Sequence, residues 1–139
     1  MIKNDRRIRA EVVKIDLALD LAILKIESDI EPFNLMGESM VGEEIIVIGS
    51  PHGYENNVSM GIVGGVDRIV YTYPKAPHYT FVDASIMPGN SGGPVINGQG
   101  QVIGIVTLIV SGEEGGYGLN AVLPSSYVRE FSKNNIEGY

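Results

Sequence analysis

Asp83-Ala-Ser-Ile-Met-Pro-Gly-Asn-Ser-Gly-Gly-Pro-Val95 is the stretch of this sequence that says most about its fold and chemistry. Its second serine, Ser91, lies between Gly-Asn and Gly-Gly pairs, so a tight turn can present its hydroxyl. Such a turn can aim the N–H groups of Gly89 and Ser91, with Asn90 between them, at one point and form an oxyanion hole. The alternative is a Gly-rich hairpin without chemistry. The six specified positions GNSGGP, followed by an apolar strand, favour a serine nucleophile.

Around this stretch the chain alternates between short apolar runs and turn residues. Gly accounts for 18 of 139 residues and Pro for 7, and they separate runs rich in Ile and Val. In the first run, Ile8, Ala10 and Val12 alternate with charged residues, which predicts a half-buried strand. The expected strands cover residues 8–15, 21–26, 44–49, 58–70, 79–83, 94–97, 102–110 and 119–123.

Two turns and one helix complete this reading. Asn97-Gly98-Gln99-Gly100 is a strong hairpin signal, and residues 111–116 form a longer loop. Near the end, Tyr127, Val128 and Phe131 fall at helical spacing, and Ser125 or Ser126 is the expected N-cap. The sequence therefore predicts an all-β domain with a C-terminal helix.

Composition excludes several classes of function. Ten basic against 17 acidic residues give a formal net charge of −7, which argues against a nucleic-acid or anionic-membrane binder. No run approaches the ~20 apolar residues of a membrane span. Cys is absent, which removes thiolate metal sites and a Cys nucleophile. The two histidines, His52 and His78, are far apart and outside any ligand-type cluster, so no metal or other cofactor is expected.

Several segments together resemble one known family over nearly the whole chain. MPGNSGGPVIN resembles the active-site serine segment of trypsin-like (chymotrypsin-fold) proteases, specifically of the HtrA/Deg type. Residues 42–51 and 81–86 resemble that branch's "GD-apolar-GNP" segment and its "TDASI" approach to the serine. Residues 4–26 are similar to its stretch around the catalytic aspartate, and residues 118–124 to the strand and proline before its terminal helix.

The resemblance implies an all-β fold, a chymotrypsin-like double β-barrel with an incomplete N-terminal barrel, a complete C-terminal barrel and a C-terminal helix. Within this single protease domain, residues 1–36 are the remnant of the N-terminal barrel. Residues 37–123 form the C-terminal barrel, and residues 124–135 form the helix.

Carried over by position, the resemblance gives the role of triad aspartate to Asp20, which would orient an imidazole and stabilise its charged form. Asp16 is the rival, but the DLAILKI context belongs to Asp20. The family places its histidine in a Thr-Asn-x-His-Val segment upstream of the aspartate, and nothing of that kind precedes Asp20 here. His52 and His78 are expected to be loop histidines that do not take the role of the base.

The resemblance also implies a specificity pocket. Ser85, six positions before Ser91, partly forms its floor, and Asn120 and Ala121 line a wall. A floor without a carboxylate implies a small or medium aliphatic side chain before the scissile bond. The family further implies extended or unfolded polypeptide substrates, a trimer and an extracytoplasmic location. A PDZ domain within this chain is not expected.

The leading interpretation is a serine endopeptidase domain of the HtrA/Deg quality-control type, inactive by itself without the segment that carries the histidine. The alternative is a pseudo-protease that holds extended peptides by strand addition and serves as a binding or scaffold module.

Overall fold

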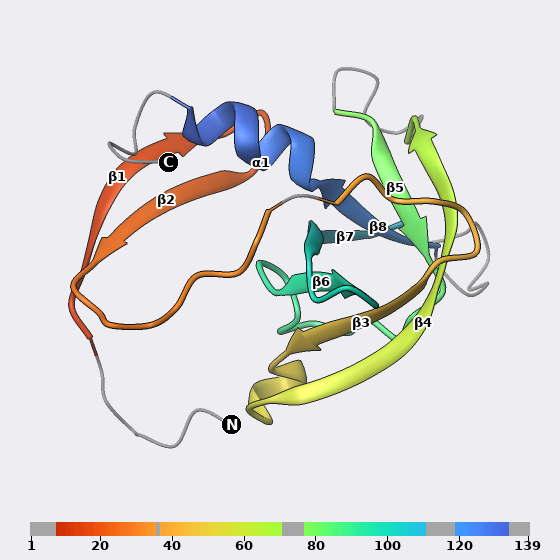
Figure 1. The fold of residues 1–139 in the computed structure, drawn as a ribbon, viewed down its shortest axis with the longest axis horizontal. Helices are drawn as coiled ribbons and strands as arrows, with labels where there is room; N and C mark the ends of the chain where they lie inside the picture. The colour runs from red at the N-terminus through yellow and green to blue at the C-terminus, as the bar shows by residue number, and fades with distance from the viewer. Residues whose placement is uncertain (1–7, 36, 71–76, 111–118, 134–139) are drawn as a thin grey trace.

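The computed structural model describes residues 8–35, 37–70, 77–110 and 119–133, and these form eight strands, one 3₁₀ turn and one α-helix (Figure 1). All eight expected strands are confirmed, with small shifts such as the end of β4 at Arg68. The expected loop at 111–116 lies outside the described residues. In order, the elements are β1 (Ala10–Asp16), β2 (Leu21–Ile26), β3 (Glu44–Gly49), η1 (Pro51–Gly53), β4 (Asn57–Arg68), β5 (Tyr79–Val82), β6 (Pro94–Asn97), β7 (Val102–Val110), β8 (Leu119–Pro124) and α1 (Ser125–Ser132).

Six of these strands close into an antiparallel barrel in the order β3-β4-β5-β8-β7-β6. Closure comes from β3, which pairs with β4 on one side and with β6 on the other. Because successive side chains of a strand point to opposite faces, Ile45 and Val47 of β3 both face the interior, and each is 1% exposed. Closure gives each of these six strands a hydrogen-bonded neighbour on both sides.

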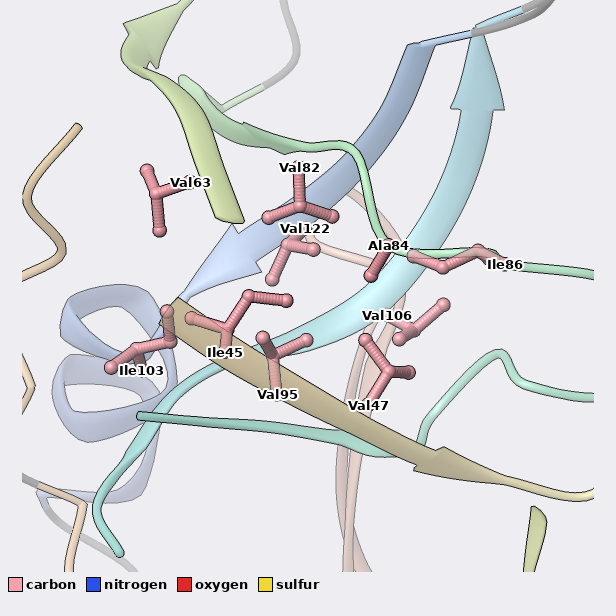
Figure 2. Close-up of a cluster of buried hydrophobic side chains, with 10 residues drawn as sticks. All are labelled: Ile45, Val47, Val63, Val82, Ala84, Ile86, Val95, Ile103, Val106 and Val122. Atoms are coloured by element: carbon pink, nitrogen blue, oxygen red, sulfur yellow. The ribbon is translucent and has the colours of Figure 1, made fainter. Parts of the chain in front are cut away.

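Small and β-branched side chains from every barrel strand fill the interior (Figure 2). Such side chains suit the crowded, pleated inner surface of a small barrel. The cluster consists of Ile45, Val47, Val63, Val82, Ala84, Ile86, Val95, Ile103, Val106 and Val122. Ala84 and Ile86 lie beyond the end of β5, so the core continues into the segment that leads to Ser91.

Strands β1 and β2 form a separate two-stranded sheet beside α1 (Figure 1). The expectation of a half-buried first strand is wrong, since Val12 is 56% exposed and Ala10 is exposed as well. The physical reason is that no second layer covers this sheet within the described part of the chain. The hairpin is attached instead through Leu21, which packs against a second buried cluster made of Val70, Tyr79, Ala121 and Leu123.

Helix α1 has no side-chain cap at its N-terminus and is attached to the fold by the side chain of its first residue. The expectation that Ser125 or Ser126 caps the helix is wrong, because the N-cap is Pro124 and no side-chain cap bond forms. Ser125 is fully buried, and its hydroxyl donates to the carbonyl of Gly37 at 3.0 Å. The helix therefore ties the β2–β3 connection to the end of β8.

The expected turn between β6 and β7 is confirmed. The side-chain oxygen of Asn97 accepts hydrogen bonds from the backbone N–H groups of Gln99 and Gln101. Gly100 has a φ of 76°, a left-handed conformation that glycine adopts without strain.

Candidate active site

Ser91 is exposed in the turn between β5 and β6. Two bonds shape this turn from within, from Asn90 N–H to Met87 O at 3.0 Å and from Gly93 N–H to Asn90 O at 2.9 Å. A third, from Gly92 N–H to Val106 O at 2.8 Å, fixes the turn to β7. The serine loop, residues 87–93, is thus a closed and anchored turn that leaves the Ser91 side chain at the surface.

The serine loop lies directly on the chain that leaves β3. The N–H of His52 donates to Pro88 O at 3.0 Å, and the N–H of Ser50 approaches Gly89 O at 3.4 Å. A Cβ at Gly89 would collide with Ser50 O, and one at Gly93 would collide with Ile48 O. These two glycines are therefore required by close backbone packing, and at Gly89 also by a φ of +104°.

The backbone N–H groups around Ser91 differ in whether they donate a hydrogen bond. The N–H of Asn90 is used inside the loop, since it donates to Met87 O. Within the described residues, the N–H groups of Gly89 and Ser91 have no hydrogen-bond partner. An oxyanion hole needs N–H groups that no other acceptor engages, and these two meet that condition.

The side chain of Asn90 lies beneath the serine loop. Asn90 is 5% exposed, and its Oδ1 is buried without a hydrogen-bond partner. It packs against Gly49, where an added Cβ would lie 2.6 Å from Oδ1 and 2.9 Å from the Asn90 Cα. The absence of a side chain at Gly49 therefore leaves the space that Asn90 of the serine loop occupies.

Asp20 lies in the turn between β1 and β2, exposed, with a left-handed φ of 53°. Its rival Asp16 shapes that turn, since Asp16 Oδ1 accepts bonds from the N–H groups of Ala18 at 2.8 Å and Leu19 at 3.0 Å. No hydrogen bond or ion pair is found for the Asp20 carboxylate among the described residues. The structure therefore gives Asp16 a local task, which is to shape the turn that contains Asp20.

The predicted pocket residues fall into two groups. Ser85 is exposed, and Asn120 donates from Nδ2 to the carbonyl of the preceding residue, Ala84, at 2.7 Å. Ser85 and Asn120 are therefore close neighbours. Ala121 is fully buried in the second cluster, beside Tyr79 and Leu123.

Two residues that the sequence analysis did not single out also hold this segment. Ser59 Oγ donates to Ser85 O at 2.7 Å, and Asp83 Oδ1 accepts from Ile62 N–H at 2.6 Å. Nothing in the local pattern around Ser59 signals this contact, because its partner is 26 residues away.

The two histidines have separate surroundings. His52 is exposed in η1 and has a left-handed φ of 52°. His78 Nδ1 pairs with Asp67 Oδ1 at 2.5 Å, and its backbone N–H donates to the Tyr127 hydroxyl at 3.1 Å. These three residues line a cavity of about 440 Å³ that no serine-loop residue lines. The interactions found for His78 therefore belong to a different region of the molecule.

The described residues contain neither a metal-binding cluster nor a membrane-spanning helix. Among these, no group of three or more His, Cys, Asp or Glu side chains is arranged to bind a metal ion. The one helix in that part of the chain is too short to cross a bilayer.

Comparison with known proteins gives consistent similarities. Residues 1–105 match the family described as trypsin-like peptidase domain. A probable periplasmic serine endoprotease DegP-like from Chlamydia trachomatis is 36% identical over 127 residues, which cover 89% of this chain and 26% of the relative. Serine protease HTRA4 from Homo sapiens is 38% identical over 138 residues, which cover 94% of this chain and 28% of the relative.

A solved structure agrees with these relatives. The HtrA-type protease AlgW with decapeptide superposes with a TM-score of 0.81 at 31% identity, over 93% of this chain and 41% of that one. The chain spans little more than a quarter of the length of the curated relatives named above.

Proposed function

The chain belongs to the trypsin-like peptidase family, with HtrA-type proteases among its relatives, and on that premise we propose that it carries the nucleophile of a serine endopeptidase. The observation that carries the proposal is the serine loop. It presents an exposed Ser91 together with two unengaged N–H groups, that of Gly89 and that of Ser91 itself. The close backbone packing at Gly89 and Gly93 supports a preorganised turn rather than a flexible one.

In the proposed reaction, Ser91 Oγ attacks the carbonyl carbon of the scissile peptide bond, and a base takes the hydroxyl proton. The carbonyl oxygen becomes an oxyanion held by the N–H groups of Gly89 and Ser91. The C–N bond then breaks, the proton passes to the leaving amine, and water later releases the acyl group by the same steps. Asp20 orients the base, which is a histidine from a segment N-terminal to β1, as the family pattern implies.

The proposal assigns a part to each region of the chain. Residues 1–36 belong to the first barrel, with Asp20 on the β1–β2 hairpin, and residues 37–123 form the second barrel. The terminal helix, expected over 124–135, is α1 (Ser125–Ser132) in the described residues. The substrates are extended polypeptides with a small aliphatic side chain before the scissile bond, bound above Ser85 and beside Asn120; Ala121 is fully buried and lines no such surface. The name of the Chlamydia trachomatis relative, a probable periplasmic protease, supports an extracytoplasmic site of action. The proposed assembly is a trimer, as the family resemblance implies.

One observation favours the second candidate function, a peptide-binding pseudo-protease. Within the described residues, no hydrogen bond joins the Ser91 hydroxyl to a base. A chain in this state holds peptides by backbone pairing and by its pocket, without cleavage.

A fluorophosphonate probe tests the choice, because it labels a serine activated by a base. Labelling is compared for the wild-type chain, Ser91→Ala and the matched control Ser126→Ala, whose serine is exposed on α1. The same set is repeated with a version that carries a Thr-Asn-x-His-Val segment ahead of β1. Labelling of the extended chain and of Ser126→Ala, with none for Ser91→Ala, supports the protease. Peptide binding with no labelling in either length supports the pseudo-protease.

A further inference from the structure

The segment between β5 and the serine loop leaves the barrel ladder yet keeps a strand-like alternation. β5 ends at Val82, and Ala84 and Ile86 point into the core while Ser85 between them is exposed (Figure 2). Backbone groups that leave a ladder need other partners, because an unpaired buried carbonyl or N–H is costly. Where those partners come from decides what the surface around Ser85 can offer to a ligand.

At the start of this segment, the backbone of β4 supplies the partners. Asp83 bridges to β4 through its N–H, which donates to Ile62 O at 3.2 Å, and through its carboxylate, which accepts from Ile62 N–H at 2.6 Å. Gly61 makes this approach possible, since a Cβ there would lie 2.5 Å from Ala84 N. The first residue of the segment is thus held against β4 by two hydrogen bonds, in which the Asp83 carboxylate takes the place of a backbone carbonyl.

The next two carbonyl groups are engaged from opposite sides. Asn120 of β8 donates from Nδ2 to Ala84 O at 2.7 Å, and Ser59 of β4 donates from Oγ to Ser85 O at 2.7 Å. Both donors are neutral. A floor with these two oxygens free would attract an ammonium or guanidinium group, whereas engaged oxygens offer much less to a cation.

We propose that Ser59 and Asn120 are specificity-positioning residues, which make the pocket floor neutral by engaging the carbonyl oxygens of Ser85 and Ala84. The inference rests on the proposed function, in which Ser85 lies below the side chain that precedes the scissile bond. The selectivity for aliphatic over basic side chains then depends on a hydroxyl on β4 and not only on the absence of a carboxylate at position 85.

The test uses product-type tetrapeptides with a free C-terminal carboxylate that end in Val, Ala or Lys. Their dissociation constants for the full chain are measured by calorimetry or by NMR titration. Ser59→Ala frees Ser85 O, so the preference for the Val peptide over the Lys peptide falls on the order of tenfold, the effect of one hydrogen bond to a charged group. Ser59→Thr keeps the hydroxyl and retains the wild-type preference. Ser126→Ala is the matched control.

Asn120→Ala is the second variant, and it keeps the test decisive if Ser59→Ala does not fold. It frees Ala84 O, and the same loss of preference is expected. An unchanged Val-to-Lys ratio in the folded variants overturns this inference alone, whereas loss of selectivity with rescue by Ser59→Thr supports it. A wild-type chain that binds none of the three peptides overturns the proposed function and the inference together.

Discussion

Lys14 Nζ donates a hydrogen bond of 3.1 Å to the carbonyl oxygen of Phe131 and lies 4.5 Å from the centroid of the same residue's ring. The contact joins β1 to the last turn of α1, and it spans 117 residues of sequence. The Lys14–Phe131 contact and the packing of Leu21 attach the β1–β2 hairpin, which carries Asp20, to the rest of the molecule. The position of the proposed triad aspartate therefore depends on a lysine and a C-terminal helix.

Lys14→Met is expected to loosen this attachment. The substitution keeps an apolar stem but removes the donor and the cation over the ring, at a cost of about 1–2 kcal/mol in the free energy of unfolding. Denaturant unfolding gives the total, and amide hydrogen exchange of β1 and β2 shows that the loss is local. Lys25→Met, on the exposed surface of β2, is the control. Equal effects for the two lysines would contradict the role given to Lys14.

Gly49→Ala is expected to displace the serine loop. The new methyl would lie 2.6 Å from Asn90 Oδ1 and 2.8 Å from Asn90 Cγ, so the buried side chain must move. Overpacking of this kind costs about 1–3 kcal/mol. Thermal unfolding measures the cost, and loss of any Ser91-dependent probe labelling reports the loop. Gly98→Ala has nothing within 4 Å of its Cβ and serves as the comparison. A loop unmoved in the NMR spectrum of Gly49→Ala would refute the prediction.

Asp16→Ala is expected to free the turn that holds Asp20. It removes the acceptor for two backbone N–H groups, those of Ala18 and Leu19, and costs about 1–2 kcal/mol in local stability. Asp16→Asn keeps an acceptor oxygen at the same place and is expected to preserve most of that stability. Hydrogen exchange at Ala18 and Leu19 distinguishes the two. Identical exchange rates in both variants would show that the side-chain oxygen does not hold the turn.

Ser125→Ala is expected to destabilise the fold although it changes one atom. Its hydroxyl is fully buried and is bonded to Gly37 O, so its removal leaves a carbonyl without that donor, at a cost of about 1–3 kcal/mol. Ser126→Ala, next in the chain but exposed, is expected to be close to neutral. Denaturant midpoints for the two variants test the contrast. A larger loss of stability for Ser126→Ala than for Ser125→Ala would contradict the structural role given to the Ser125 hydroxyl.

Glu130 offers a test of electrostatics on α1. The Lys133 ammonium, 2.7 Å away, hydrogen-bonds its carboxylate and holds the pKa of Glu130 below its usual range. A lowered folded-state pKa contributes stability above the unfolded pKa, and this contribution is lost as pH falls through the folded value. Both side chains are exposed, so the effect on unfolding is small. In an NMR titration, the midpoint for Glu130 is expected to rise in Lys133→Gln. An unchanged midpoint would show that Lys133 does not lower the pKa of Glu130.

The barrel was predictable because its information is local. Short apolar runs rich in Ile and Val mark the strands, and glycine-containing turns such as Asn97–Gly100 separate them. The alternation within the first run misled at β1, where Ala10 and Val12 are exposed, since a pattern shows which residues share a face and not what covers that face. The cap at Ser125 failed for a related reason, because a carbonyl 88 residues away takes its hydroxyl.

The candidate site was predictable only in part. The glycines around Ser91 are visible in the sequence because a tight turn needs them at adjacent positions. The contacts of Ser59 with Ser85 and of Gly49 with Asn90 are not visible, since they join strands that pair only in three dimensions. Asp20 follows from a family resemblance, and its role remains a prediction.

Barrel closure has a consequence for a newly made chain. The serine loop is bonded to the chain after β3 on one side and to Val106 of β7 on the other. A ribosome delivers β3 well before β7, so the nascent polypeptide holds Ser91 without the strand that completes its turn. A half-synthesised chain therefore holds the serine loop without the bond from Gly92 N–H to Val106 O that fixes it to β7.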